Sequence, residues 1–230
     1  MAAFDWSTKW GFLVIPAVCG FGCLTNLINV LVFINPKMKD NSFKYLLAIA
    51  ICNIFYLGLG SYSFLYLCTG CPSQLSYFTN VYYNYVVHYV CSTLSIFCIL
   101  ADIYLSLLRY LVLKNKTFLQ SISYLKVCPI LFLISSLFYI APMFLKEIKP
   151  IKQIKVNNTV VYTAYFAFDN SVGATPFGKT LPIVITSIRI ILATVVLTCV
   201  NVLNALEFRK RYSKRVKHTT SIFSINIVNY

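Results

Sequence analysis

The sequence predicts an all-α membrane protein, a transmembrane helix bundle, and three observations lead to this fold class. Of its 230 residues, 59% are hydrophobic and 11% are charged, and the mean hydropathy is +0.74. Soluble domains contain about 45–50% apolar and about 25% charged residues. Several apolar runs reach the roughly 20 residues that a helix needs to cross the hydrocarbon core of a bilayer. The basic residues lie in short clusters between these runs, as in the cytoplasmic loops of membrane proteins.

Five apolar runs each predict a membrane-spanning helix, and together they make a transmembrane bundle over residues 10–206. Residues 1–9 form the expected N-terminal segment, and residues 146–180 form the long loop between the fourth and fifth helices. Residues 207–230 follow as a basic tail or as the start of a further loop. The expected helices cover residues 10–34, 44–67, 77–112, 122–145 and 181–206.

The distribution of lysine and arginine predicts how the bundle is oriented in the membrane. With the N-terminus outside, thirteen of these residues lie on the inner side and six on the outer side. Cytoplasmic loops carry the excess of basic residues in membrane proteins. We therefore expect a multi-pass protein of the plasma membrane with its N-terminus outside. The sequon at Asn157 would then be accessible to glycosylation, whereas the sequon at Asn115 would be cytosolic and unused.

The composition and the scattered polar residues argue against two function classes. An excess of 20 Lys+Arg over 6 Asp+Glu also occurs in nucleic-acid-binding proteins, but the clusters between spans favour a membrane protein with no nucleic-acid partner. The two histidines, His88 and His218, fall on opposite sides of the membrane, and no two carboxylates lie close together within a span. We therefore expect no enzyme and neither a metal nor another cofactor.

Two of the nine cysteines lie outside the apolar runs, in the loop LCTGCPSQ. These are Cys68 and Cys71, whereas the other seven lie inside predicted spans, where cysteine acts as a small hydrophobic residue. The loop pair has no second Cys or His pair with which to close a zinc site. We therefore expect either a loop disulfide or two free thiols.

Polar residues inside the predicted spans are candidates for function, since each needs a partner or water there. Asn26 and Asn53 lie near the middle of the first two spans and either join neighbouring helices or belong to a functional switch. Asp102 and Arg109 share one face of the third span, about 10 Å apart along its axis. That distance is too long for a local ion pair, so each needs a partner on another helix or water. Arg109 either extends to lipid headgroups or has a functional role.

Three further residues lie toward the outer ends of the spans. His88 and Cys91 belong to the third span, near the mouth of any cavity, and His88 is either a hydrogen-bonded interfacial histidine or a ligand contact. Arg189 lies well inside the fifth span, roughly 12 Å below its outer end. Its side chain either extends outward or faces the interior of the bundle, where it would meet a ligand.

Taken together, these positions resemble those of the rhodopsin-like (family 1) G-protein-coupled receptors across all five spans. Thr25-Asn26 stands where these receptors usually have Gly-Asn. The stretch LLAIAICN resembles their Leu-Ala-x-x-Asp pattern, with Asn53 in place of the aspartate. In DIYLSLLRY, Arg109 and Tyr110 match the end of their acidic-arginine-aromatic triplet, and Leu108 replaces the acid.

Further residues extend the resemblance, and the family implies a function. Pro142 fits the fourth helix of the family, and the stretches NSFKYLLAI and SLLRYLVLKNK look most like the divergent orphan receptors of small invertebrates. The resemblance implies an extracellular ligand that enters between the outer halves of the spans. It also implies a heterotrimeric G protein bound on the inner face through Arg109, Tyr110, the loop LVLKNKTFLQ and the basic tail. The implied ligand-pocket candidates are His88, Cys91 and Arg189, and the implied intramembrane polar network is Asn26, Asn53 and Asp102.

Departures from the family pattern narrow these expectations. Leu108 leaves Arg109 without its usual acidic neighbour, which implies raised basal activity. Asn53 removes the carboxylate of the family's sodium site, so we expect no sodium ion there. Cys91 stands where amine receptors have an aspartate, which disfavours an amine ligand. The loop 146–180 has no cysteine, so the family's usual disulfide to the third helix cannot form.

The family has two helices more than the five found here. Five of an expected seven would then be present, which implies a fragment, a truncated gene model or a five-helix remnant with altered function. The expected ligand is a peptide or a chemosensory molecule. The outer lysines and Arg189 favour a ligand with an anionic group. The basic tail is also expected to bind anionic membrane lipids.

Two alternatives from other classes remain open. In a transporter or channel subunit, Asp102, Arg109 and Arg189 would line a polar pathway through the membrane. Transporters often have inverted repeats or broken helices, and neither is visible in the sequence. The second alternative is a truncated receptor remnant that does not signal.

Overall fold

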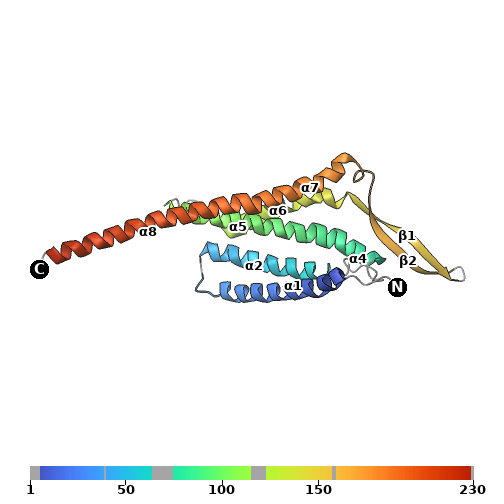
Figure 1. Ribbon diagram of the computed structural model, residues 1–230, viewed down its shortest axis with the longest axis horizontal. Coiled ribbons are helices and arrows are strands. Elements are labelled where there is room, and N and C mark those ends of the chain that lie inside the picture. The colour runs from blue at the N-terminus through green and yellow to red at the C-terminus, as the bar shows by residue number, and fades with distance from the viewer. Residues whose placement is uncertain (1–5, 39, 64–74, 115–122, 157–158, 229–230) are drawn as a thin grey trace.

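The computed structural model describes residues 6–38, 40–63, 75–114, 123–156 and 159–228. Side chains are described for the same residues except 6–13, 152–156, 159–163 and 213–228. Long helices lie side by side and a two-stranded hairpin projects from one end (Figure 1). We call this the hairpin end, and the opposite end, beyond which the last helix extends, the tail end. The first helix begins at the hairpin end.

Five of the described helices are long and apolar enough to cross a membrane. The protein is therefore a multi-pass, helical membrane protein, and the predicted fold class is confirmed. The spans are Val14–Phe33, Asn41–Ser61, Tyr77–Leu113, Tyr124–Met143 and Pro176–Tyr212.

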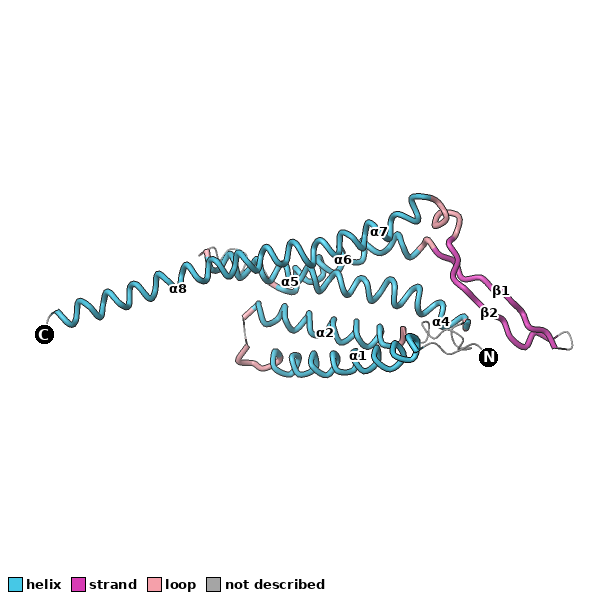
Figure 2. The backbone as a smooth tube through the Cα atoms, viewed as in Figure 1, coloured by secondary structure: helices cyan, strands magenta, loops and turns pink. Residues whose placement is uncertain are grey.

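The third and fifth spans each contain a segment of the wider π-helix, in which residue i bonds to residue i+5. Figure 2 shows that both nevertheless run on as continuous helices along the bundle. The elements in order are α1 (Trp6–Phe33), α2 (Asn41–Ser61), α4 (Tyr77–Val81), η2 (Tyr82–Cys91), α5 (Ser92–Leu113), α6 (Tyr124–Met143), β1 (Lys146–Val156), β2 (Thr159–Asp169), α7 (Pro176–Ile191), η4 (Leu192–Val196) and α8 (Leu197–Val228).

The fifth span begins five residues earlier than the apolar pattern indicated, at Pro176. Thr175 is the N-cap, and its Oγ1 accepts a hydrogen bond from the Gly178 backbone N–H at 3.1 Å. Proline is favoured at the first helical position because its missing N–H would have no partner there. The helix itself continues beyond the span, through the basic tail to Val228, because that stretch contains neither proline nor glycine to end it.

The hairpin was not expected from the apolar pattern, which indicated only a long loop. Its strands pair antiparallel, with Lys146 opposite Asp169 at the base. The second strand, TVVYTAYFAFD, is rich in the β-branched and aromatic residues that favour strands. Two residues, Asn157-Asn158, separate the strands in the sequence. Two such runs joined by two turn-forming residues are a hairpin pattern, and this pattern could have indicated the fold of the loop.

The buried core surrounds α5, which is the central helix of the bundle. Near the tail end, Leu105 and Leu108 pack with Tyr45 of α2. Near the hairpin end, Ile96 packs with Tyr139 of α6 and Ile185 of α7. In contrast, α1 has large apolar side chains on its outer surface, and Phe21 is 70% exposed. Side chains of this kind face lipid in a membrane, where exposure of apolar surface has no cost.

Candidate functional site

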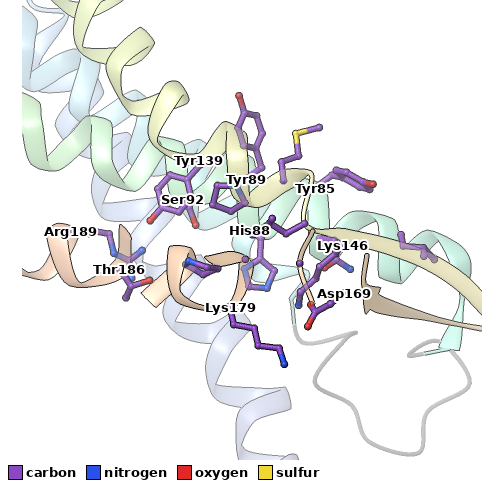
Figure 3. A pocket seen from close by; sticks show the side chains of 18 residues that line it. Tyr85, His88, Tyr89, Ser92, Tyr139, Lys146, Asp169, Lys179, Thr186 and Arg189 are labelled. Carbon is purple, nitrogen blue, oxygen red and sulfur yellow. The ribbon is translucent and has the colours of Figure 1, made fainter. Parts of the chain in front are cut away.

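A cavity of about 500 Å³ lies at the hairpin end, between the third, fourth and fifth spans and the base of the hairpin (Figure 3). We call it the hairpin-end cavity. Its volume falls within the roughly 300–1,000 Å³ that is usual for small-molecule sites. The residues that line it include Asn84, Tyr85, His88, Tyr89, Tyr139, Pro142, Met143, Lys146, Asp169, Gly173, Gly178, Lys179, Pro182, Thr186 and Arg189.

The π-helical segment η2 supplies one wall of the cavity. Four of its residues, Asn84, Tyr85, His88 and Tyr89, line the cavity. Asn84 is buried, and its Nδ2 donates to the backbone oxygen of Asn80 at 2.8 Å. The wider helix brings residues four and five apart onto one face, so the two pairs 84/88 and 85/89 point the same way. Segments of π-helix occur often at functional sites.

One face of α7 supplies the opposite wall. Lys179, Pro182, Thr186 and Arg189 line the cavity from this helix. Their spacing of three, four and three residues places them above one another along an α-helix. The N-terminal turn of α7 also reaches the cavity at Gly178. The early start of this helix therefore brings Lys179, which the sequence placed in a loop, into the same wall as Arg189.

Asn80 holds the hairpin against the third span. It is fully buried, and its Nδ2 donates to the backbone oxygens of Ser76 at 3.0 Å and Tyr165 at 3.1 Å. The ring of Tyr77 contacts that of Tyr165 edge to face, with 5.1 Å between the centroids. Because Tyr165 belongs to β2, these contacts fix the strand whose last residue, Asp169, lines the cavity.

Asn170 closes the base of the hairpin. Its backbone N–H donates to the oxygen of Leu145 at 2.9 Å. Its Oδ1 accepts from the backbone N–H groups of Val172 at 3.1 Å and Gly173 at 2.8 Å. Gly173 lies so close to Leu145 that a Cβ at this position would come within 2.1 Å of the Leu145 oxygen. The chain thus turns tightly between β2 and α7, which brings both into the wall of the cavity.

Among the described residues, the cavity carries three cationic side chains, Lys146, Lys179 and Arg189, and one carboxylate, Asp169. Asp169 lies opposite Lys146 in the hairpin. Arg189 lies beside Thr186, on the other side of the cavity (Figure 3). The Arg189 side chain is half-buried. Within the described parts of the chain, it has no carboxylate at ion-pair distance and no hydrogen bond. The cavity therefore has a net positive charge and one guanidinium whose donors are available.

The sequence-predicted pocket residues separate into two groups. His88 and Arg189 both line the cavity. Cys91 does not, because it is buried against α2, where its Sγ lies 3.9 Å from the backbone oxygen of Tyr56. In an α-helix, residues 88 and 91 would share a face, but η2 has a wider turn and directs them apart. The candidates Cys68, Cys71 and Asn157 lie outside the described residues.

Two of the three residues expected in an intramembrane polar network are joined. Asn53 Nδ2 donates to Asn26 Oδ1 at 3.4 Å, and Asn26 Nδ2 donates to the oxygen of Gly22 at 2.8 Å. Cys98 joins these two asparagines in place of Asp102, and its Sγ lies 3.4 Å from Asn53 Oδ1. Asp102 is half-buried and forms neither a hydrogen bond nor an ion pair with any described residue. These contacts connect α1, α2 and α5, and the carboxylate of Asp102 takes no part in them.

At the tail end, the structure leaves Arg109 exposed and Tyr110 partly exposed. The neighbouring Leu108 is only 4% exposed and packs in the apolar cluster with Tyr45 and Leu105. Lys114 Nζ lies 3.5 Å from Glu207 Oε2 and 5.7 Å from the centroid of the Tyr110 ring. Arg109 makes no ion pair with the residues that the structure describes.

Sequence reasoning missed the contacts that join the third and fifth spans. Ser106 Oγ donates to Asn201 Oδ1 at 3.1 Å, and Asn204 Nδ2 donates to the backbone oxygen of Ser106 at 2.9 Å. With Lys114 and Glu207, they bond α5 to α8 over several turns. The pattern that could have indicated them is VNVLNAL, in which two asparagines three residues apart share one face of an apolar span.

Among the described residues, no three His, Cys, Asp or Glu side chains gather as a metal site would require. The side chains that line the cavity offer charge, hydrogen-bond donors and aromatic contact to a ligand. The sequence matches no model of a known protein family, and a search of curated proteins finds no match.

Proposed function

We propose that the chain is a divergent receptor of the rhodopsin-like G-protein-coupled family, in the plasma membrane with its N-terminus outside. An extracellular ligand binds in the hairpin-end cavity. A heterotrimeric G protein binds at the tail end, where Arg109 and Tyr110 contact it.

The continuity of two helices between the cavity and the tail end carries this proposal. The third span reaches from the cavity at η2 to Arg109, and the fifth from the cavity at α7 to Glu207. The two spans are bonded to each other near the tail end through Ser106 and Asn204. A ligand that prefers one arrangement of these helices would shift the population of that arrangement. The same shift would change the surface around Arg109.

The environment of Leu108 supports the role given to Arg109. A carboxylate at position 108 would lie in the apolar cluster beside Tyr45, where an unpaired charge is costly. The leucine leaves the exposed guanidinium of Arg109 with no acidic neighbour in the sequence. It is therefore available to a partner without first breaking an ion pair, which fits the raised basal activity expected from the sequence.

The positions of the charged residues favour the receptor over a transporter. A polar pathway would need Asp102, Arg109 and Arg189 to line one passage. Of these three residues, Arg189 alone lines the hairpin-end cavity. Arg109 lies at the opposite end of the bundle, and Asp102 lies between them on α5.

The test is nucleotide exchange on purified G proteins by the full chain in lipid nanodiscs. We expect exchange above that of empty nanodiscs without added ligand, and a loss of about tenfold with Arg109→Ala, as for one hydrogen bond to a charged group. Lys149→Ala is the matched control, because it removes an exposed cation from the hairpin, where no G protein binds. Exchange no greater than in empty nanodiscs would favour the non-signalling remnant. An unchanged rate of nucleotide exchange with Arg109→Ala would contradict the role proposed for that residue.

A further inference from the structure

We propose that the hairpin-end cavity binds a small organic carboxylate with an aromatic or alkyl body, and that the guanidinium of Arg189 holds the carboxylate. This inference rests on the proposed function only in taking the cavity as the receptor's ligand site.

The state of Arg189 is the first step of the argument. The residue lies within a membrane span, where a charged side chain is costly unless it is paired or faces a water-filled cavity. Arg189 faces the cavity and has no carboxylate at ion-pair distance in the described chain. A guanidinium remains charged at any physiological pH and binds a carboxylate through two parallel hydrogen bonds. An anionic ligand would supply the missing partner.

The rest of the cavity's charge favours the same ligand. Asp169, the only carboxylate among the described lining residues, lies opposite Lys146. Lys179 stands on the same face of α7 as Arg189, nearer the N-terminus of that helix. Because Lys179 is exposed, its expected effect is to attract an anion to the cavity more than to hold it. The same field repels an amine.

The other wall determines the body of the ligand. Tyr139 is buried at the cavity, and Tyr85 and Tyr89 line it from η2. Pro142 and Met143 of α6 add apolar surface beside them. Aromatic side chains pack well against flat or alkyl groups and contribute large apolar contact areas. A ligand with its charge at Arg189 would place its body against this wall, and a volume of about 500 Å³ suits a small molecule.

The test is direct binding of matched probe pairs to the full chain in nanodiscs of neutral lipid. The panel consists of aryl and alkyl monocarboxylates, each paired with its own primary amide, and binding is measured by isothermal calorimetry and by the shift in unfolding temperature. We expect carboxylates to bind and their amides to bind at least about tenfold more weakly, since the amide loses the charge-assisted hydrogen bonds. Added salt should weaken the carboxylates and leave the amides unchanged.

Two variants assign the effect to one residue. Arg189→Gln should lower carboxylate affinity about 10- to 100-fold, and Arg189→Lys should give an intermediate loss because the charge remains without the planar fork. Lys126→Gln, which removes an exposed cation from the tail end of α6, should change nothing. If Arg189→Gln does not fold, the salt dependence and the amide comparison on the unaltered chain still decide the matter.

The proposal is overturned if no carboxylate in the panel binds, if amides bind as well as carboxylates, or if binding survives Arg189→Gln in a folded protein. These results are separate from those for the proposed function. Carboxylate binding with no G-protein activation would contradict the receptor but support the ligand class. G-protein activation with no preference for carboxylates would support the receptor but contradict the ligand class.

Discussion

Gly173 shows how one residue without a side chain shapes the cavity wall. It is buried at the turn between β2 and α7, against the backbone of Leu145. The two nearest atoms belong to the Leu145 backbone and cannot move aside as a side chain could. Gly178 is placed in the same way, with its own Cβ position 2.3 Å from the oxygen of Val172. These two glycines allow the hairpin base and the start of α7 to meet.

We expect Gly173→Ala to destabilise the fold by about 1–3 kcal/mol, because the added methyl group must displace backbone. Gly58→Ala is the control, since a Cβ there meets nothing within 4 Å. In a helix interior that change should stabilise by about 0.5–1 kcal/mol. Chemical unfolding in detergent measures both variants. Equal stability of the two variants would mean that the turn can relax around the methyl group.

Spacing in the sequence predicts how deep a residue lies in a span, but it does not always predict which way its side chain faces. His88 and Arg189 are polar residues in outer half-spans, and both line the cavity. Cys91, which the sequence places near the outer end of the third span, faces α2 instead. The difference arises from η2, because a change from α- to π-helix rotates every residue that follows it. No feature of the sequence YYNYVVHYVC indicates that change from α- to π-helix.

Among the elements, α1 and α2 depend on a polar contact inside the membrane. The Asn26–Asn53 hydrogen bond joins them near the middle of their spans. We expect a double-mutant cycle of Asn26→Ala and Asn53→Ala to give a coupling energy of about 0.6 kcal/mol, and at most about 1.7 kcal/mol, as for other hydrogen bonds between membrane helices. Unfolding in mixed micelles is the measurement.

The control for this cycle pairs Asn26→Ala with Ser61→Ala, whose hydroxyl bonds only within α2, to the oxygen of Gly58. Distant sites that share no partner are additive, so this pair should show no coupling. Coupling of similar size in both cycles would mean that the alanines act through general loosening of the helix pair.

The hairpin is the element whose form depends most on its surroundings. Within the described part of the chain its strands pair only with each other, and an isolated two-stranded hairpin is marginally stable in water. Asn80 and Tyr77 of the third span supply the contacts that hold it. The long basic loop anticipated between the fourth and fifth spans is therefore an ordered part of the cavity wall at its base.

At the scale of the whole molecule, the exposed apolar surface and the basic clusters define the relation to the membrane. Residues such as Phe21 and Leu31 of α1 are 70% and 67% exposed, as expected for contact with lipid. The tail end carries Lys114, Arg109 and the basic start of the tail. Under the orientation that we propose from the positive-inside rule, that end faces the cytoplasm and the hairpin-end cavity opens outside.

The proposed orientation predicts where a glycan is attached. We expect the protein made in eukaryotic cells to carry an N-linked glycan at Asn157, because that sequon would face the lumen. Digestion with an endoglycosidase should increase the mobility of the protein on a gel. Asn157→Gln should abolish the increase, whereas Asn115→Gln, at the sequon on the other side, should leave it intact. A glycan at Asn115 instead of Asn157 would mean that the orientation is the reverse of the one proposed and that the cavity opens to the cytoplasm.

The sequence by itself determined the class of the molecule, since five apolar runs can be stable only when lipid surrounds them. It also determined which polar residues in the spans needed partners, because burying each unpaired group in lipid is costly. Only the tertiary structure decided the identity of those partners. Asn53 meets Asn26 and Cys98, and Arg189 faces a cavity instead of a carboxylate. Such pairings depend on helix rotation and on a hairpin whose base packs against the start of the third span. Neither follows from hydropathy, which records how apolar a segment is and not which way its side chains face.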